Sequence, residues 1–319
     1  MRYNYISIKD SRFPKMVVVE VCNICNFRCL HCGYRKIIND RRYKPCFLDF
    51  KIYKKVVNEV LKYKNSFLRF TSDGEPLMHP EFINMVRYAK NSGCYPLTVN
   101  TNGMLLTGEK SKELLDAGID IVEVSLNAFR KETYNKLRIG GDYDTVIENI
   151  NKLIRYRNKN KYKTKIMVSM IDSLDIPGYN EEILEFKRYW AKRVDKIIMR
   201  KFFDQQGLVD INRSRKHKIM KDRYPCPQLW KRITVSSNGW LKYCVNDWFN
   251  LTAIADLRNK EVFIYRVWNS EEYKEMRKNQ IAGKYDRMNM CGSCTDWKAM
   301  DWEYDYNYAV ERLINEKKN

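Results

Sequence analysis

The residues best suited to chemistry are four cysteines near the start of the chain: Cys22, Cys25, Cys29 and Cys32. The last three have the spacing C-x3-C-x2-C and follow an apolar run, which predicts that they lie in the loop after a first strand. Three thiolates leave one iron of a [4Fe–4S] cluster open to a substrate or cofactor, whereas a structural zinc site normally closes with four ligands. We expect Cys22 to be a buried thiol of the strand. A zinc site that includes it is the alternative.

A second set of four cysteines occupies the last third of the chain: Cys226, Cys244, Cys291 and Cys294. The segment RITVSSNGWLKY, between the first two, predicts a β-hairpin with Asn-Gly at its turn. A hairpin returns the chain and brings its flanking cysteines together, and the CGSC segment adds a C-x2-C pair. From the residues alone, a zinc ribbon and an iron–sulfur site fit this set equally well.

The elements that position these cysteines follow a repeating order of apolar run and helical pattern. The runs predict strands at 16–21, 67–71, 96–101, 119–126, 165–170 and 194–200. Helical patterns lie between them, including 47–63, 80–90 and 143–157. This alternation predicts an α/β fold with a parallel sheet, in which functional residues gather at the C-terminal ends of the strands.

The pattern changes near residue 201, beyond which long helical patterns are few and most tryptophans occur. We therefore predict a core domain over 1–201, a smaller cysteine-rich domain over 202–300 and a terminal helix over 301–319. In the segment FDQQG, the side chains of Asp204, Gln205 and Gln206 are placed either to line a substrate pocket between the domains or to form a polar interdomain loop.

The composition predicts a soluble, cytoplasmic protein without a membrane partner. Hydrophobic residues make up 44% of the 319 positions, enough for a core, and no signal peptide or membrane-spanning run is present. In a reducing compartment, ten cysteines in clusters favour metal ligation over disulfides. The net charge of +20, with basic runs at 155–165 and 213–218, indicates either solvated surfaces or an anionic partner.

Four short motifs follow the cysteine triad at the expected strand ends: SDGEP (72–76), TNG (101–103), VSLNA (124–128) and LRIGG (137–141). With the triad, in this order and over nearly the whole chain, they resemble the radical S-adenosylmethionine (SAM) enzymes. The resemblance implies a partial (β/α)6, TIM-like barrel. It also implies a SAM-binding [4Fe–4S] cluster on Cys25, Cys29 and Cys32, with a 5′-deoxyadenosyl radical formed from SAM.

The same resemblance implies a set of SAM contacts. The DGEP stretch would take the amino group of SAM through backbone carbonyls and the Glu75 side chain, although Asp73 stands where the family has glycine. Ser125 would face the ribose or the carboxylate, and Arg138 would pair with the carboxylate. The full set implied is Gly74, Glu75, Asn102, Ser125, Asn127 and Arg138.

The second cysteine set resembles the SPASM domain of these enzymes in its shortened form, twitch. The resemblance implies one auxiliary [4Fe–4S] cluster held by Cys226, Cys244, Cys291 and Cys294, and hence two clusters in the protein. Four protein ligands leave no open iron, which favours a role in electron transfer or structure.

The resemblance implies hydrogen-atom abstraction from a C–H bond. Relatives with the shortened domain lead us to expect dehydrogenation or epimerisation of a carbinol carbon in a sugar or cyclitol, phosphorylated or nucleotide-linked in view of the charge. A flavodoxin- or ferredoxin-like protein would be the reductant. The alternatives are a peptide or protein maturase, an RNA-modifying enzyme, and a non-catalytic zinc protein that binds nucleic acid.

Overall fold

The computed structural model describes residues 12–71, 73–172, 174, 176–209, 223–300, 302 and 306–315. Its strands form one sheet in the order β6-β5-β4-β3-β2-β1-β7-β8-β9, and every neighbouring pair from β6 to β7 is parallel. The parallel strands are β1 (Met16–Val19), β2 (Phe67–Phe70), β3 (Leu97–Thr101), β4 (Ile121–Ser125), β5 (Lys165–Ile171), β6 (Lys196–Arg200) and β7 (Arg232–Val235). The antiparallel strands β8 (Trp240–Lys242) and β9 (Ala253–Asp256) complete the sheet.

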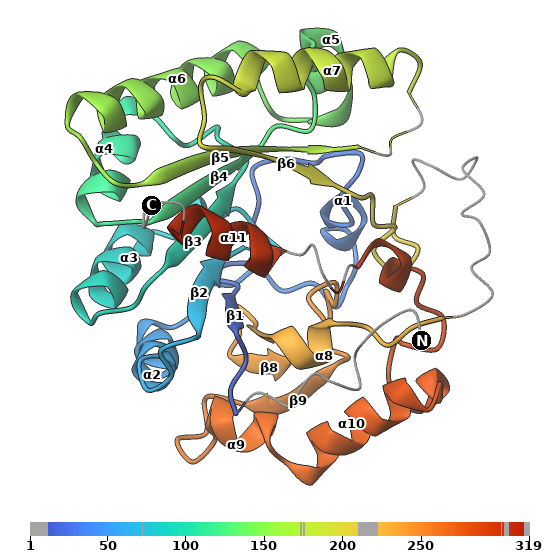
Figure 1. Ribbon diagram of the computed structural model, residues 1–319. Coiled ribbons are helices and arrows are strands. Elements are labelled where there is room, and N and C mark those ends of the chain that lie inside the picture. The colour runs from blue at the N-terminus through green and yellow to red at the C-terminus, as the bar shows by residue number, and fades with distance from the viewer. Residues whose placement is uncertain are drawn as a thin grey trace.

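Helices surround the outer face of this sheet, and the C-terminal helix α11 lies on its inner face (Figure 1). Several begin where a side chain accepts a backbone N–H of the first turn, as Asp49, Thr107, Asp142 and Ser270 do. The helices are α1 (Tyr34–Ile37), α2 (Phe50–Val60), α3 (Phe82–Asn91), α4 (Gly108–Asp116), α5 (Lys131–Leu137), α6 (Tyr143–Lys159), α7 (Tyr179–Trp190), α8 (Gln228–Lys231), α9 (Ile264–Trp268), α10 (Glu271–Ile281) and α11 (Tyr306–Asn315).

The two faces of the sheet pack against different partners because successive strand residues point to opposite sides. On β1, Val17 and Val19 belong to the main core beneath the outer helices. Met16 and Val18 belong instead to a separate apolar cluster that includes Val310 of α11. The C-terminal helix therefore fills the inner face of the curved sheet at the ends where its strands begin.

The predicted strand-helix alternation and partial barrel are confirmed, with strand and helix ends shifted by a few residues. The predicted hairpin is confirmed as β7 and β8, with Gly239 N–H donating to the carbonyl of Ser236 at the turn. However, the hairpin does not form a separate sheet, because β7 pairs in parallel with β1. The domain bounds 1–201, 202–300 and 301–319 stay a prediction, and the basic run 213–218 lies outside the described residues.

In the part of the chain that the structure describes, no helix combines the length and the apolar character needed to cross a bilayer.

A buried ionic triad joins the C-terminal hairpin to the core. The ammonium group of Lys242, on β8, lies 3.1 Å from Glu20 Oε1 and 3.3 Å from Asp73 Oδ2, and it donates to the carbonyl of Asp247 at 2.6 Å. Burial opposes its charge, but the carboxylates of Asp73 and Glu20 outweigh burial and raise the pKa of Lys242. Burial and the nearby Glu20 raise the pKa of Asp73 well above its usual value. Two carboxylates thus share one buried cation.

Lys242→Met is expected to lower the free energy of unfolding by about 3–5 kcal/mol, because it leaves two buried carboxylates without their cation. Anaerobic urea unfolding followed by tryptophan fluorescence measures the change. Lys278→Met, an exposed change on α10, is the matched control and should have little effect. Adding Glu20→Gln and Asp73→Asn to Lys242→Met should recover most of the loss. An unchanged midpoint in the single variant would contradict the assigned role.

Candidate active site

The cysteine triad and all six residues predicted to contact SAM line one cavity of about 230 Å³. They come from the loops after β1, β2 and β3, from the end of β4 with the loop that follows it, and from the end of α5. Five segments that are distant in the sequence therefore meet at one edge of the sheet, as the parallel topology requires. The structure brings together every member of this set: Cys25, Cys29, Cys32, Gly74, Glu75, Asn102, Ser125, Asn127 and Arg138.

The loop that carries the triad is fixed by the LRIGG segment after α5. Arg28 N–H donates to the carbonyl of Ile139 at 2.7 Å. A Cβ on Gly141 would lie 2.5 Å from the Phe27 ring, and one on Gly140 would lie 3.0 Å from the Asn26 carbonyl. Gly140 and Gly141 have no side chains, and this lets their loop pack directly on the cysteine loop.

The triad fits a cationic cluster. Burial is the main reason why the pKa of the Cys25 thiol is raised to about 12, and burial also raises the pKa of Cys29 and Cys32. Such thiols ionise when a metal binds them, because the metal supplies the charge that burial withholds. Cys22 is buried, as predicted, and its thiol donates to the carbonyl of Glu75 at 3.2 Å, so it has a structural contact of its own.

The DGEP turn packs directly on the cysteine loop. A Cβ on Gly74 would lie 2.4 Å from the Cys22 carbonyl, so this position tolerates only glycine. The buried Glu75 carboxylate accepts from Thr101 Oγ1 and from the Asn102 N–H, each at 2.7 Å. Glu75 therefore ties the loop after β2 to the TNG turn after β3. Burial raises its pKa, although these donors act in the opposite direction.

Arg138 and Asn127 present buried polar atoms that have no partner among the described residues. In Arg138 these atoms are Nε and Nη2, and in Asn127 the atom is Oδ1. The amide of Asn127 donates to Ser125 Oγ at 3.1 Å and lies 3.0 Å from His31 Nε2. Burial lowers the pKa of His31 to about 3, so its ring is neutral. Sequence analysis missed His31, although its place inside C-x3-C-x2-C was a usable signal.

The second cysteine set also converges, on a smaller cavity of about 30 Å³ lined by Cys226, Cys244, Cys291 and Cys294. Burial raises the pKa of Cys226 to about 11 and that of Cys291 to about 12, so this set too fits a metal cluster. Gln280 of α10 accepts the Cys226 N–H at 3.0 Å through Oε1, which leaves its NH₂ group 3.6 Å from Met288 Sδ. The amide of Gln280 therefore donates to Met288 Sδ, and the Gln280 side chain also forms a hydrogen bond that lowers the pKa of Cys291.

The FDQQG segment lies between the two cysteine sites. Gln205 Oε1 accepts the N–H of Gly33, next to Cys32, at 2.8 Å, and Gln206 lines the second cavity. Both residues have positive φ angles, 51° and 62°, a conformation that costs energy in residues other than glycine and clusters at functional sites. Asp204 accepts from Thr295 Oγ1 at 2.5 Å. Gln205 thus lines the pocket region, and Asp204 contacts Thr295, the residue that follows the CGSC pair.

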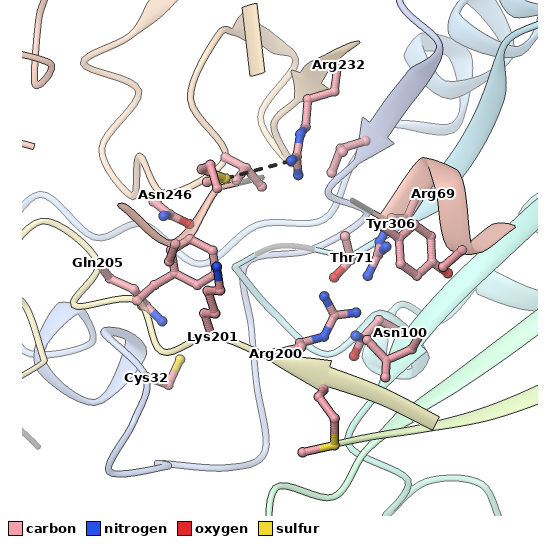
Figure 2. A pocket seen from close by; sticks show the side chains of 18 of the residues that line it. Cys32, Arg69, Thr71, Asn100, Arg200, Lys201, Gln205, Arg232, Asn246 and Tyr306 are labelled. Carbon is pink, nitrogen blue, oxygen red and sulfur yellow. Dashed lines mark hydrogen bonds between the residues drawn. The ribbon is translucent and has the colours of Figure 1, made fainter. Parts of the chain in front are cut away.

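A larger cavity of about 620 Å³ adjoins the first (Figure 2). The two share the lining residues Cys32, Thr71, Asp73, Asn100, Arg200, Lys201, Phe203 and Gln205. Among the described residues that line the larger cavity, two are carboxylates, Asp73 and Asp172, and five are cations: Arg69, Lys196, Arg200, Lys201 and Arg232. Space for a second molecule therefore lies beside the predicted SAM site, and cations outnumber carboxylates among its described lining residues.

Two family sequence models match this chain. The Radical SAM superfamily matches residues 19–189, which is more than half of the chain, and the SPASM iron–sulfur cluster-binding domain matches residues 226–295.

Curated relatives include a tungsten-containing aldehyde ferredoxin oxidoreductase cofactor-modifying protein of Pyrococcus furiosus, 31% identical over 49% of this chain. The match spans only 43% of that relative's own length. Probable GTP 3′,8-cyclases of Methanococcus aeolicus and Methanococcus maripaludis are 28% and 25% identical. These matches span 79% and 74% of this chain and 92% and 87% of the relatives.

Similar solved structures include BtrN in complex with AdoMet and 2-DOIA, with a TM-score of 0.62 and 16% identity over 94% of this chain and 99% of that one. Streptococcus suis SuiB bound to precursor peptide SuiA gives a TM-score of 0.66 and 14% identity over 97% and 75%. At these identities the likeness shows the fold. Together with the family matches, it shows that the chain belongs to the radical SAM superfamily, as an iron–sulfur enzyme that uses SAM and a [4Fe–4S] cluster and carries a SPASM-type domain for auxiliary iron–sulfur binding.

Proposed function

We propose that this enzyme removes a hydrogen atom from a carbinol carbon of an anionic carbohydrate and oxidises that carbon to a carbonyl. When bound, the first cluster and SAM supply the 5′-deoxyadenosyl radical, and the auxiliary cluster supplies an electron acceptor. The residues of the chain hold these groups, orient the substrate and accept the hydroxyl proton.

We assign the first cluster to Cys25, Cys29 and Cys32, and the SAM carboxylate to Arg138. The Nε and Nη2 atoms of Arg138 have no partner among the described residues, which supports this assignment, since a buried guanidinium pairs well with a carboxylate. Gly74 and Glu75 would present backbone carbonyls to the amino group. The Glu75 carboxylate is already bonded to the TNG turn, and we therefore assign it mainly a positioning role.

Asn102, Ser125 and Asn127 are assigned to the remaining polar groups of SAM. Asn102 is held by an Asn26 side chain at 2.7 Å, and Asn127 by Ser125 and His31. Each side chain is therefore oriented before SAM arrives, which lowers the entropy cost of binding.

The observation that supports an anionic small-molecule substrate best is the large cavity beside the SAM site. It shares lining residues with that site, so a bound molecule lies next to SAM, and its described lining has more cations than carboxylates. Helix α11 covers the inner face of the sheet at the opposite end, which suits a compact ligand better than an extended chain.

Oxidation is favoured over epimerisation by the groups that this cavity offers. Asp73 lines both cavities, and it shares the Lys242 ammonium group with Glu20. When Asp73 takes up the hydroxyl proton, Glu20 still balances the charge of Lys242. Epimerisation would need a hydrogen-atom donor. Among the described lining residues the only cysteine is Cys32, which we assign to the cluster.

The test incubates anaerobically reconstituted enzyme with SAM, dithionite and carbinol-deuterated candidates: a hexose phosphate, a nucleotide sugar, an uncharged cyclitol and GTP. We expect deuterium in 5′-deoxyadenosine, together with a ketone product, only with a phosphorylated or nucleotide-linked sugar. Asp73→Asn should retain deuterium transfer but lose most of the ketone. Turnover of the uncharged cyclitol alone, or cyclisation of GTP, would refute the proposal.

A further inference from the structure

The large cavity beside the SAM site shares a wall with the cavity of the second cysteine set. Among the described residues, Asn246 and Met300 line both of these cavities. No described residue lines both the second cysteine cavity and the cavity that holds the predicted SAM contacts. In the part of the chain that the structure describes, the second cysteine set therefore borders the proposed substrate space and not the SAM space.

Asn246 also has a hydrogen bond to one of the cysteines. It lies two positions after Cys244 in the sequence. Burial raises the pKa of Cys244 well above its usual value, and a hydrogen bond from the backbone N–H of Asn246 acts in the opposite direction. Such a bond favours the thiolate, which is the form that ligates a metal. One residue thus has its backbone on a cysteine of the second set and its side chain at the wall of the large cavity.

Hydrogen bonds fix the side chain of Asn246. Its amide donates to Asp296 Oδ2 at 2.8 Å, and Asp296 Oδ1 accepts the Gln205 N–H at 3.2 Å. Gln205 Oε1 in turn accepts the N–H of Gly33, next to Cys32. Figure 2 shows Asn246 and Gln205 at the same end of the cavity as Cys32. A continuous set of hydrogen bonds therefore connects the loop of the first cysteine set to the Asn246 amide.

The backbone of Asn246 is held by the next residue, Asp247, which is fully buried. The Asp247 carboxylate accepts the N–H groups of Leu251 and Thr252, at 3.0 and 2.6 Å. Its carbonyl accepts from the Lys242 ammonium group at 2.6 Å. Because both the backbone and the side chain of Asn246 are fixed, its distances to Cys244 and to a molecule in the large cavity are set by the fold.

We propose that Asn246 is the contact through which the electron of the substrate radical leaves the large cavity for the auxiliary cluster. This role rests on the proposed function for the origin of that radical. The path runs from the Asn246 side chain through its backbone N–H to the Cys244 sulfur, along covalent bonds and one hydrogen bond. Tunnelling of an electron along such a path is faster than tunnelling across open space.

The step is a one-electron oxidation of the carbinol radical that hydrogen-atom abstraction leaves. The O–H bond breaks as Asp73 takes up the proton, and the second bond of the carbonyl forms between carbon and oxygen. The electron is accepted by the oxidised auxiliary cluster by way of Asn246. Atoms and charge therefore balance with Asp73 as the proton acceptor and the auxiliary cluster as the oxidant.

The first measurement requires no turnover. Reconstituted holoenzyme is exchanged into D2O and reduced with dithionite, and pulsed electron paramagnetic resonance records the deuterium modulation of the cluster signals. Asn246→Ala removes the side chain from the wall but keeps the backbone N–H, so water of the large cavity should approach the second cysteine set and deepen the modulation. The same measurement with alanine at Cys25, Cys29 and Cys32 assigns the signal to the auxiliary cluster.

The second measurement is the ratio of ketone to 5′-deoxyadenosine in a single turnover with the carbinol-deuterated substrate. Asn246→Ala should retain deuterium transfer and about eight irons per chain but lower this ratio several-fold. Water near a cluster stabilises its more charged, reduced form and so raises the reduction potential, which by itself favours electron uptake. A lower ratio at an equal or higher potential therefore reports a lost path.

Two further variants separate the path from other effects. Met300→Ala opens the same wall without removing Asn246, so it should deepen the deuterium modulation but lower the product ratio less than Asn246→Ala does. Asn269→Ala is the matched control, because Asn269 follows α9, donates to the carbonyls of Arg12 and Tyr265, and lines neither cavity. It should leave both measurements unchanged. Circular dichroism and iron content verify that each variant is folded and loaded.

Unchanged deuterium modulation in Asn246→Ala would overturn the place of this residue between the two cavities. An unchanged product ratio, an equal loss in Met300→Ala, or a loss that accompanies a lower reduction potential would overturn its role in electron transfer. Absence of deuterium transfer from every carbinol substrate in the parent protein would refute the proposed reaction, and with it the electron step. Deepened modulation in Asn246→Ala would in that case still place Asn246 between the cavities.

Discussion

Alanine at Cys25, Cys29 and Cys32 together is expected to abolish SAM cleavage and to halve the iron content, from about eight to about four irons per chain. The three thiolates line the cavity that also contains the predicted SAM contacts, and the second set lies in a separate cavity. The loss should therefore be confined to one cluster. Iron and sulfide are counted after anaerobic reconstitution, and 5′-deoxyadenosine is measured after addition of dithionite and SAM.

The control is Cys94→Ala, which changes a buried cysteine that lines neither cysteine cavity. It should retain both clusters and full 5′-deoxyadenosine formation. Stoichiometric zinc and no 5′-deoxyadenosine in the parent protein would contradict the assignment, and Cys22 would then become the candidate fourth ligand.

Alanine at Cys226 and Cys244 together is expected to give the complementary result: about four irons lost, 5′-deoxyadenosine formation retained, and the oxidised product reduced by at least about two orders of magnitude. Without an acceptor for its second electron, the substrate radical cannot become a carbonyl at an ordinary rate. The measurement is the ratio of product to 5′-deoxyadenosine, with electron paramagnetic resonance to identify the remaining cluster. An unchanged ratio would contradict a role in electron transfer.

Gln280→Glu separates electron transfer from a purely structural role of this cluster. The variant keeps the oxygen that accepts the Cys226 N–H. It replaces the amide group, which lies beside the sulfur atoms of Met288 and Cys291, with a negatively charged carboxylate. Hydrogen bonds and local charge set cluster potentials, so the auxiliary reduction potential should become more negative while the iron content stays at about eight irons per chain. Asn279→Asp makes the same chemical change at the neighbouring position, which does not line the cavity, and should shift the potential less. Product formation that follows the potential supports electron transfer.

The sequence by itself determined the features that depend on local pattern. Alternating apolar runs and amphipathic segments predicted the parallel sheet, because strand and helix periods are read over a few residues. The Asn-Gly turn predicted the hairpin of β7 and β8, and the positions of Cys25, Cys29 and Cys32 after β1 placed them at the correct end of the sheet. Conformational preferences of this kind need no knowledge of distant residues.

Only the tertiary structure decided how charged residues within the apolar strands are compensated. Arg69 on β2 and Glu123 on β4 face the inner side of the sheet and form an ion pair across the strand β3 that lies between them. Lys242 pairs with Asp73, which is 169 positions away in the sequence. A strand pattern with period two defines two faces but does not say which face a later helix, such as α11, will cover. Burying an ion depends on partners that the fold assembles, so the cationic cavity became visible only once the barrel had closed around it.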